Sequence, residues 1–146
     1  MITSAAGTAS DPVTTTIDRS QLRLFAKATG QTDPTWTDLA VAQAAGHRDL
    51  PVPPTFLFGI ELDRPEPFGW LTEHGVEMGS VLHGSQSFDY VTPVYAGDTV
   101  TARSSIVDVQ VKKGGALTMV ERRTDISRGV VTVARLTSVI VVRSAA

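Results

Sequence analysis

The chain contains three histidines, His47, His74 and His83, and no cysteine. Histidine titrates near neutral pH, so each of them is a candidate general acid or base. The three are too scattered for metal-ligand spacing, and the lack of cysteine excludes thiolate catalysis, disulfides and zinc ribbons. The serine-hydrolase, dinucleotide-binding and phosphate-loop motifs are also missing, so we expect no metal and no bound cofactor. His83 is the candidate acid–base residue, unless it is an ordinary outward-facing strand residue.

A second segment of chemical interest is Gly30–Trp36, which reads Gly-Gln-Thr-Asp-Pro-Thr-Trp. Asp33-Pro34 is a common start for an Asx-type turn, so on local grounds the segment links two helices and Trp36 packs into the core. Its side chains offer little acid–base chemistry. Gln31 cannot accept a proton at neutral pH, and the indole nitrogen of Trp36 is only a donor.

The composition predicts one soluble globular domain. The 146 residues are 42% hydrophobic and 19% charged with a net charge of −2, which argues against wholesale disorder and against nucleic-acid binding. No apolar run approaches the roughly 20 residues that cross a bilayer. Met1–Ser10 lacks the basic and apolar regions of a secretory signal. We therefore expect a cytoplasmic protein that binds neither nucleic acid nor membrane.

The elements that must position these residues begin with helices. Residues 1–15 are small, polar and aperiodic, and we predict a disordered tail there. Asp18 and Gln21 have the spacing of a capping box, which predicts a helix that begins at this point. Gly30 should end that helix, because glycine readily adopts the left-handed conformation of a helix C-terminus.

Two further helices are expected before the strands. Thr37 can cap a short alanine-rich helix at residues 38–45. Pro53-Pro54 then precedes a third helix at about Thr55–Leu62, since proline suits a first helical turn. This segment is apolar nearly all round, and a helix without a polar face is normally buried.

From Met78 onward the hydrophobic period is two, which predicts strands. We expect a first strand that places His83 on the face opposite Phe88, after a flap-like connection at residues 64–77. Long strands should follow at residues 99–112, 116–126 and 130–143, joined by glycine-containing hairpin turns.

Helices followed by hairpin-connected strands predict an α+β fold. We expect a single domain at residues 16–143, with an antiparallel sheet wrapped around the central helix Thr55–Leu62 and a short tail at residues 144–146. A small sheet of this kind leaves edges that must be covered. Joining two sheets across an edge would cover them, so we expect the protein to form a dimer.

An ordered series of segments resembles the MaoC-like dehydratases, and within them the branch of N-terminal-type domains. The series extends from about Ile17 to Arg143, in order and with sensible gaps. Its members are Phe25–Trp36, Ala44–Phe56, Leu82–Tyr90, Pro93–Asp98 and Lys112–Leu117. The resemblance implies a hot-dog fold, in which Thr55–Leu62 is the central helix, in agreement with the independent reading of one buried helix and an antiparallel sheet.

The resemblance also implies a ligand class, namely enoyl or hydroxyacyl groups carried as thioesters on coenzyme A or acyl carrier protein, as in fatty acid metabolism. Catalytic members carry Gly-Asp-x-Asn-Pro-x-His, in which Asp and His activate a water and move a proton. Here those two positions hold Gln31 and Trp36. The resemblance therefore implies a non-catalytic, substrate-binding subunit whose partner is a second hot-dog chain that carries the intact pair.

Further residues are assigned to substrate binding by the same resemblance. Pro54 and Thr55 begin the central helix, where free backbone amides would meet an oxyanion. One face of that helix could line an acyl tunnel, and the loop of His47 would flank the ligand mouth. The predicted substrate-binding residues are Pro54, Thr55, Phe56, Gly59, His47 and Gly84.

Two alternatives remain open on the sequence. The chain could be a self-sufficient homodimeric hot-dog hydratase or thioesterase that uses His83, Glu61 or Asp89 as its acid–base group. It could also be a non-enzymatic protein that binds acyl thioesters or assists assembly.

Overall fold

The computed structural model describes residues 1–144, so positions 145 and 146 of the predicted C-terminal tail lie outside the described residues. The chain forms one five-stranded sheet in the order β1-β3-β4-β5-β2, and every pairing is antiparallel. The strands are β1 (Val13–Thr16), β2 (Val81–Tyr90), β3 (Thr99–Lys112), β4 (Leu117–Arg128) and β5 (Val131–Arg143). The predicted α+β class is confirmed, and the three long strands lie where the period of two placed them.

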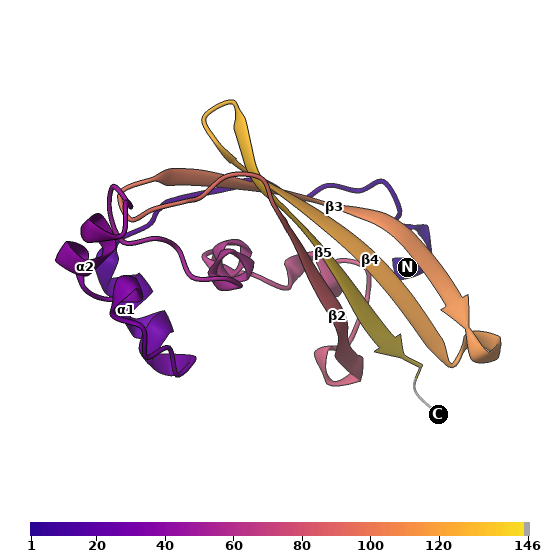
Figure 1. The fold of residues 1–146 in the computed structure, drawn as a ribbon. Coiled ribbons are helices and arrows are strands. Elements are labelled where there is room, and N and C mark those ends of the chain that lie inside the picture. Colours follow the sequence, from indigo (N-terminus) through magenta and orange to yellow (C-terminus); the bar gives the residue numbers. More distant parts are fainter. Residues whose placement is uncertain (145–146) are drawn as a thin grey trace.

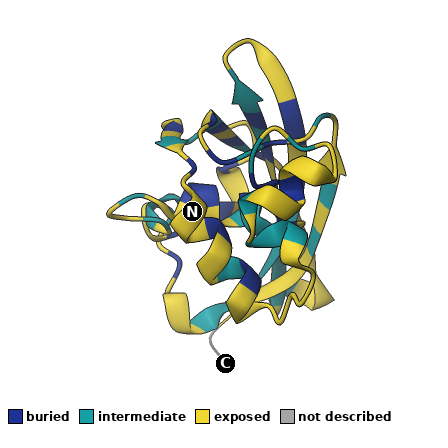
Figure 2. Cartoon of the chain, turned by 60° about the vertical axis from the view of Figure 1, so that its left-hand side comes forward, coloured by how far each residue is buried: buried dark blue, intermediate teal, exposed yellow. Residues whose placement is uncertain are grey.

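The sheet is curved, and the helices α1 and α2 and the central helical segment lie on its concave side (Figure 1). The α-helices are α1 (Arg19–Ala28), α2 (Leu39–Ala44) and α3 (Gly69–Thr72). The 3-10 helices are η1 (Ile2–Ser4), η2 (Pro34–Trp36), η3 (Phe56–Leu62), η4 (Met78–Ser80) and η5 (Lys113–Gly115). Buried residues gather where the helical segments meet the sheet (Figure 2). Within residues 1–144, no helix is long and apolar enough to span a membrane.

Local capping signals place the first two α-helices. The Asp18 carboxylate accepts from the backbone N–H groups of Ser20 and Gln21, and the Gln21 side chain accepts from Asp18 N–H, which completes the predicted capping box of α1. The predicted N-cap residue of α2, Thr37, was wrong. Asp38, not Thr37, accepts from the first-turn amides of that helix, since a carboxylate is the stronger acceptor.

The central helix begins at Phe56, is a 3-10 helix, and is only partly buried, whereas the sequence predicted a buried helix. η3 is a 3-10 helix, and it follows Thr55, whose φ of 72° is left-handed. That conformation is costly for a β-branched residue and blocks a regular α-helical start. Leu57 and Ile60 are buried under the sheet, whereas Gly59 and Leu62 are exposed. One side of the central helix is therefore uncovered in the single chain.

The predicted disordered tail at residues 1–15 is also wrong. Residues 7–10 form backbone hydrogen bonds along the edge of β3, and β1 extends that pairing. Ile2 and Ala5 are buried with Leu71 of α3 in a second, smaller core. A polar, aperiodic segment can be ordered in this way because the unpaired edge of β3 provides backbone partners that local sequence does not reveal.

Strand β2 contains a bulge at Gly84 that corrects the predicted faces. His83 pairs with Ile140 and Ser85 with Val139, so Gly84 is the extra residue. Phe88 pairs with Leu136, which lies on the same face of β5 as Ile140. An inserted residue reverses the alternation of side chains between the two faces of a strand. The bulge therefore turns His83 to the helix-covered face, which is also the face of Phe88. The prediction that the two residues lie on opposite faces was wrong.

Replacing Gly84 with Ala is expected to lower the free energy of unfolding by about 1–3 kcal/mol. A Cβ at this position would lie 2.9 Å from the backbone oxygen of Val139 and 3.1 Å from a methyl carbon of Val141. The backbone oxygen cannot move without disturbing the β2–β5 pairing. Urea denaturation measures the effect. Gly79→Ala is the matched control, because no atom of residues 1–144 lies within 4 Å of a Cβ there. Equal stability of the two variants would contradict the prediction.

Candidate functional site

An apolar groove lies between α1 and the uncovered side of η3. It has a volume of about 580 Å³. At its wall, the rings of Phe25 and Phe56 meet edge to face with their centroids 5.3 Å apart. Residues that line the groove include Leu24, Phe25, Ala28, Thr55, Phe56, Phe58, Gly59 and Leu62. Three of the predicted substrate-binding residues, Thr55, Phe56 and Gly59, are thus brought together here.

A smaller pocket of about 250 Å³ lies next to the start of η3. Trp36, Pro54, Leu57 and Tyr90 line it. The Thr55 N–H donates to the Tyr90 hydroxyl at 2.9 Å, and Phe56 N–H donates to the backbone oxygen of Pro53 at 3.2 Å. These two amides at the helix start are therefore already occupied, and the expectation that they are free to meet an oxyanion is wrong for this structure.

The two positions of the missing acid–base pair are in different surroundings. Gln31 is exposed in the loop after α1, and its N–H donates to the backbone oxygen of Ala26 at 2.9 Å. Trp36 is half-buried in the wall of the smaller pocket. The turn between them is the predicted Asx type, because the Asp33 carboxylate accepts from Thr35 N–H at 2.9 Å. This hydrogen bond lowers the pKa of Asp33.

The alternative acid–base candidates are separated by the fold. His83 is exposed and reaches the helix-covered face, where its ring meets Phe58 edge to face at 5.8 Å. Asp89 is exposed and pairs with Arg135 on the opposite face. Glu61 is buried in an ion pair with Arg122. Of these three candidates, only His83 contacts an aromatic side chain that lines the groove, namely Phe58.

His47 belongs to a separate cluster beside the turn that precedes β3. Its Nδ1 lies 3.2 Å from the Tyr95 hydroxyl, and the Arg48 guanidinium lies 4.6 Å from the centre of the Tyr95 ring. Arg48 and Arg128 both donate to the buried carboxylate of Asp98. Burial by itself raises the pKa of Asp98, but these hydrogen bonds outweigh it and the pKa is lowered. The contacts anchor a turn, and His47 does not line the groove.

Arg19 of α1 holds Asp49 through two hydrogen bonds of 2.9 and 2.7 Å. The hydrogen bond from Arg19 lowers the pKa of Asp49 to about 2. Because this folded-state pKa lies below that of an unfolded aspartate, the pair stabilises the protein above about pH 4 and its contribution disappears as pH falls toward 2. Arg19 is 45% exposed, so solvent screening keeps this gain small.

Replacing Arg19 with Met should therefore lower the free energy of unfolding modestly at pH 7 and much less near pH 2, where about half of the Asp49 carboxylates are protonated even in the folded protein. Urea denaturation at both pH values tests this. Arg23→Met is the comparison on the same helix, because Arg23 donates to the backbone oxygen of Thr37, which does not titrate. If the Arg19 variant loses the same free energy of unfolding at both pH values, the stabilisation does not come from the ionised Asp49 carboxylate.

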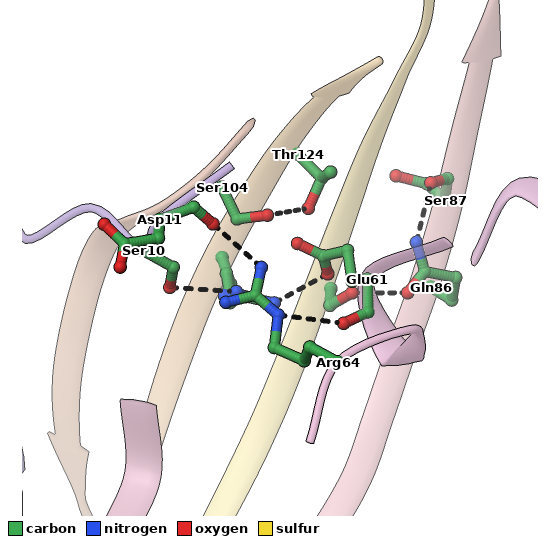
Figure 3. Close-up of polar contacts among 10 residues, drawn as sticks. Ser10, Asp11, Glu61, Arg64, Gln86, Ser87, Ser104 and Thr124 are labelled. Atoms are coloured by element: carbon green, nitrogen blue, oxygen red, sulfur yellow. Dashed lines mark hydrogen bonds and ion pairs between the residues drawn. The ribbon is translucent and has the colours of Figure 1, made fainter. Parts of the chain in front are cut away.

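A buried ion pair under η3 was not predicted. Arg122 Nη1 of β4 lies 2.6 Å from a carboxylate oxygen of Glu61, and its other terminal nitrogen donates to Ser10 Oγ at 3.1 Å (Figure 3). The guanidinium also stacks 4.7 Å from the centre of the Trp70 ring. Burial lowers the pKa of Arg122. The only sequence signal was a lone glutamate in an otherwise apolar helix, since the partner lies 61 residues away in sequence.

Beside this ion pair lies an inner cavity of about 60 Å³. Its walls are mainly apolar and include Trp70, Leu71, Val81 and Ile140, with Glu61 and Arg122 as charged members. Phe58 and Leu62 line both this cavity and the larger groove. These two side chains therefore separate the groove from the inner cavity.

A family model described as the FAS1-like dehydratase domain region matches residues 4–135. The chain is 39% identical over 94 residues to a UPF0336 protein of Streptomyces griseus, a match that covers 64% of this chain and 63% of that one. It is 30% identical over 125 residues to a UPF0336 protein of Thermobifida fusca, covering 86% and 82%. The chain thus spans less than two thirds of the first of these relatives.

Solved structures show the same fold. The C-terminally truncated HadBC (3R-hydroxyacyl-ACP dehydratase) complex of Mycobacterium tuberculosis matches with a TM-score of 0.78 and 24% identity, over 97% of this chain and 99% of that one. The ChsH1–ChsH2 complex of the same organism has a TM-score of 0.76 and 21% identity, over 94% and 90%. A MaoC-like dehydratase has a TM-score of 0.85 and 17% identity, over 99% of this chain and 44% of that one. The chain therefore belongs to the FAS1-like dehydratase domain family and has the hot-dog fold of the MaoC-like dehydratases.

Proposed function

We propose that this chain is the acyl-thioester-binding, non-catalytic subunit of a heteromeric (R)-specific enoyl-thioester hydratase or 3-hydroxyacyl dehydratase. The observation that carries the proposal is the apolar groove along η3. In the same chain, the two acid–base positions of the family hold Gln31, which is exposed, and Trp36, which lines the smaller pocket. The groove is suited to hydrocarbon, and neither residue accepts a proton at neutral pH. The ligand is an acyl group on coenzyme A or acyl carrier protein, in the cytoplasm.

In the proposed complex, a second hot-dog chain carries the Asp and His that this chain lacks. Hydration adds the oxygen of water to the β-carbon of the enoyl group and a proton to the α-carbon, so it needs a base for the water and an acid for the carbon. This chain holds the acyl group. The HadBC and ChsH1–ChsH2 matches are both complexes, and the chain covers 44% of the longer MaoC-like dehydratase, which supports a pairing of two such domains.

The free edge of the sheet at β2 is the surface at which we expect the second subunit to pair. β2 is an edge strand, so its outer backbone groups are available to a partner strand. Leu82, Tyr90 and Val91 are 47%, 52% and 67% exposed along it. Exposed apolar side chains beside an unpaired edge favour continuation of the sheet into a second subunit.

The test is to assay the purified chain on crotonyl- and longer enoyl-thioesters, alone and together with a co-expressed hot-dog chain that has the intact Gly-Asp-x-Asn-Pro-x-His segment. We expect turnover by the pair and none by this chain alone. Robust turnover by the homodimer that disappears in His83→Ala would support the self-sufficient enzyme instead. Binding of acyl thioesters without turnover in any mixture would leave a non-enzymatic acyl-binding protein.

A further inference from the structure

The ion pair of Glu61 and Arg122 leaves one hydrogen-bond acceptor and one donor unused. Among residues 1–144, neither Oε1 of Glu61 nor Nε of Arg122 has a hydrogen-bond partner. The Arg122 side chain is 8% exposed and that of Glu61 11%. Unsatisfied polar atoms this deeply buried are costly and need an explanation.

Both side chains line the inner cavity, whose remaining walls are mainly apolar. An anion there could pair only with the Arg122 donor and would be repelled by Glu61, and a cation could pair only with the Glu61 acceptor and would be repelled by Arg122. A methyl end would leave both atoms unpaired. A hydroxyl group is neutral and can donate to Glu61 while it accepts from Arg122. We propose that the inner cavity recognises a hydroxyl group on the acyl chain of the ligand. The proposal rests on the acyl-binding function proposed above.

The path to this cavity leads from the groove. Phe58 and Leu62 line both spaces, and Gly59 between them carries no side chain. Nothing lies within 4 Å of a Cβ built on Gly59, so the groove is open at that point. A rotation of Phe58 would admit the end of a chain. The cavity volume of about 60 Å³ holds roughly two groups the size of a water molecule, enough for a terminal hydroxyl and its carbon.

The experiment compares two ligand series on the 146-residue chain by isothermal titration calorimetry. One series is of unsubstituted saturated acyl-CoA thioesters, and the other is of ω-hydroxyacyl-CoA thioesters of the same chain lengths. At the length that spans the groove, we expect the hydroxylated ligand to bind about tenfold more tightly, because hydrogen bonds to charged groups are the strong ones. At shorter lengths the unsubstituted ligand should bind at least as well.

The double variant Glu61→Met/Arg122→Met removes the polar end of the cavity while it retains its volume. An apolar replacement of a whole buried ion pair is usually tolerated. This variant should lose the tenfold preference, because an unsubstituted chain end no longer leaves two polar atoms unpaired and a hydroxyl group no longer finds them.

If the native chain binds the two series equally at every length, the proposal is overturned and the acyl-binding function is left intact. A water molecule that permanently fills the cavity would give this result. Binding of neither series would overturn both. The comparison on the native chain decides the matter even if the double variant does not fold.

Discussion

Replacing Arg122 with Met is expected to lower the free energy of unfolding by about 3–5 kcal/mol. The substitution leaves the Glu61 carboxylate buried under η3 without its 2.6 Å partner. It also removes the hydrogen bond to Ser10, which holds the N-terminal segment against β3. An uncompensated buried charge costs more than the pair contributes, so the loss should be large. Urea denaturation at pH 7 measures it.

Two further variants separate charge from packing. Arg123→Met changes the neighbouring residue of β4, which is exposed, and should alter stability by no more than about 0.5 kcal/mol. Adding Glu61→Met to Arg122→Met should restore most of the lost stability, because no charge then remains unpaired. If the double variant is as unstable as the single one, the effect arises from lost packing on Trp70 and not from the carboxylate.

Replacing Gly59 with Trp is expected to weaken acyl-thioester binding by about a hundredfold or more. The new indole would occupy the groove, whose volume is about 580 Å³ and whose walls are mainly apolar. The variant should still fold, because a side chain at this position points into open space and the backbone of Gly59 does not have a positive φ. Each buried methylene of a ligand contributes about 0.8 kcal/mol, so exclusion of a few of them accounts for the loss.

Gly59→Ala is the matched control, because one methyl group leaves the groove almost unchanged. Calorimetric titration with a saturated acyl-CoA gives the affinities, and size-exclusion chromatography with the co-expressed partner gives the assembly state. A Gly59→Trp chain that binds the acyl-CoA normally but no longer assembles would show that the groove is the subunit interface and not the acyl site.

Much of the fold could be predicted because its signals are local. The capping box of Asp18 and Gln21 needs only residues three apart, and the alternation of β3 needs only its own side chains. The Asx turn at Asp33 is likewise made by neighbours. That Gln31 and Trp36 cannot accept a proton at neutral pH follows from side-chain chemistry, whereas the resemblance to the MaoC-like dehydratases identifies their positions with an acid–base pair. For these features the sequence was sufficient.

Other features depend on partners that are distant in sequence. The bulge at Gly84 exists because β2 pairs with β5, and it is this pairing that turns His83 toward Phe58. The N-terminal segment is ordered because the edge of β3 provides its hydrogen bonds. No local pattern contains either fact, so sequence reasoning placed His83 on the wrong face and read an ordered segment as a tail.

The sequence by itself determined the fold class and the order of the elements, because periodicity and capping are properties of residues and their near neighbours. Only the tertiary structure decided that the central helix is a 3-10 helix with one uncovered side. It also decided that Glu61 meets Arg122 beside a small cavity. Those outcomes arise from packing between segments far apart in the chain, where the geometry of contact sets burial and leaves particular atoms unpaired.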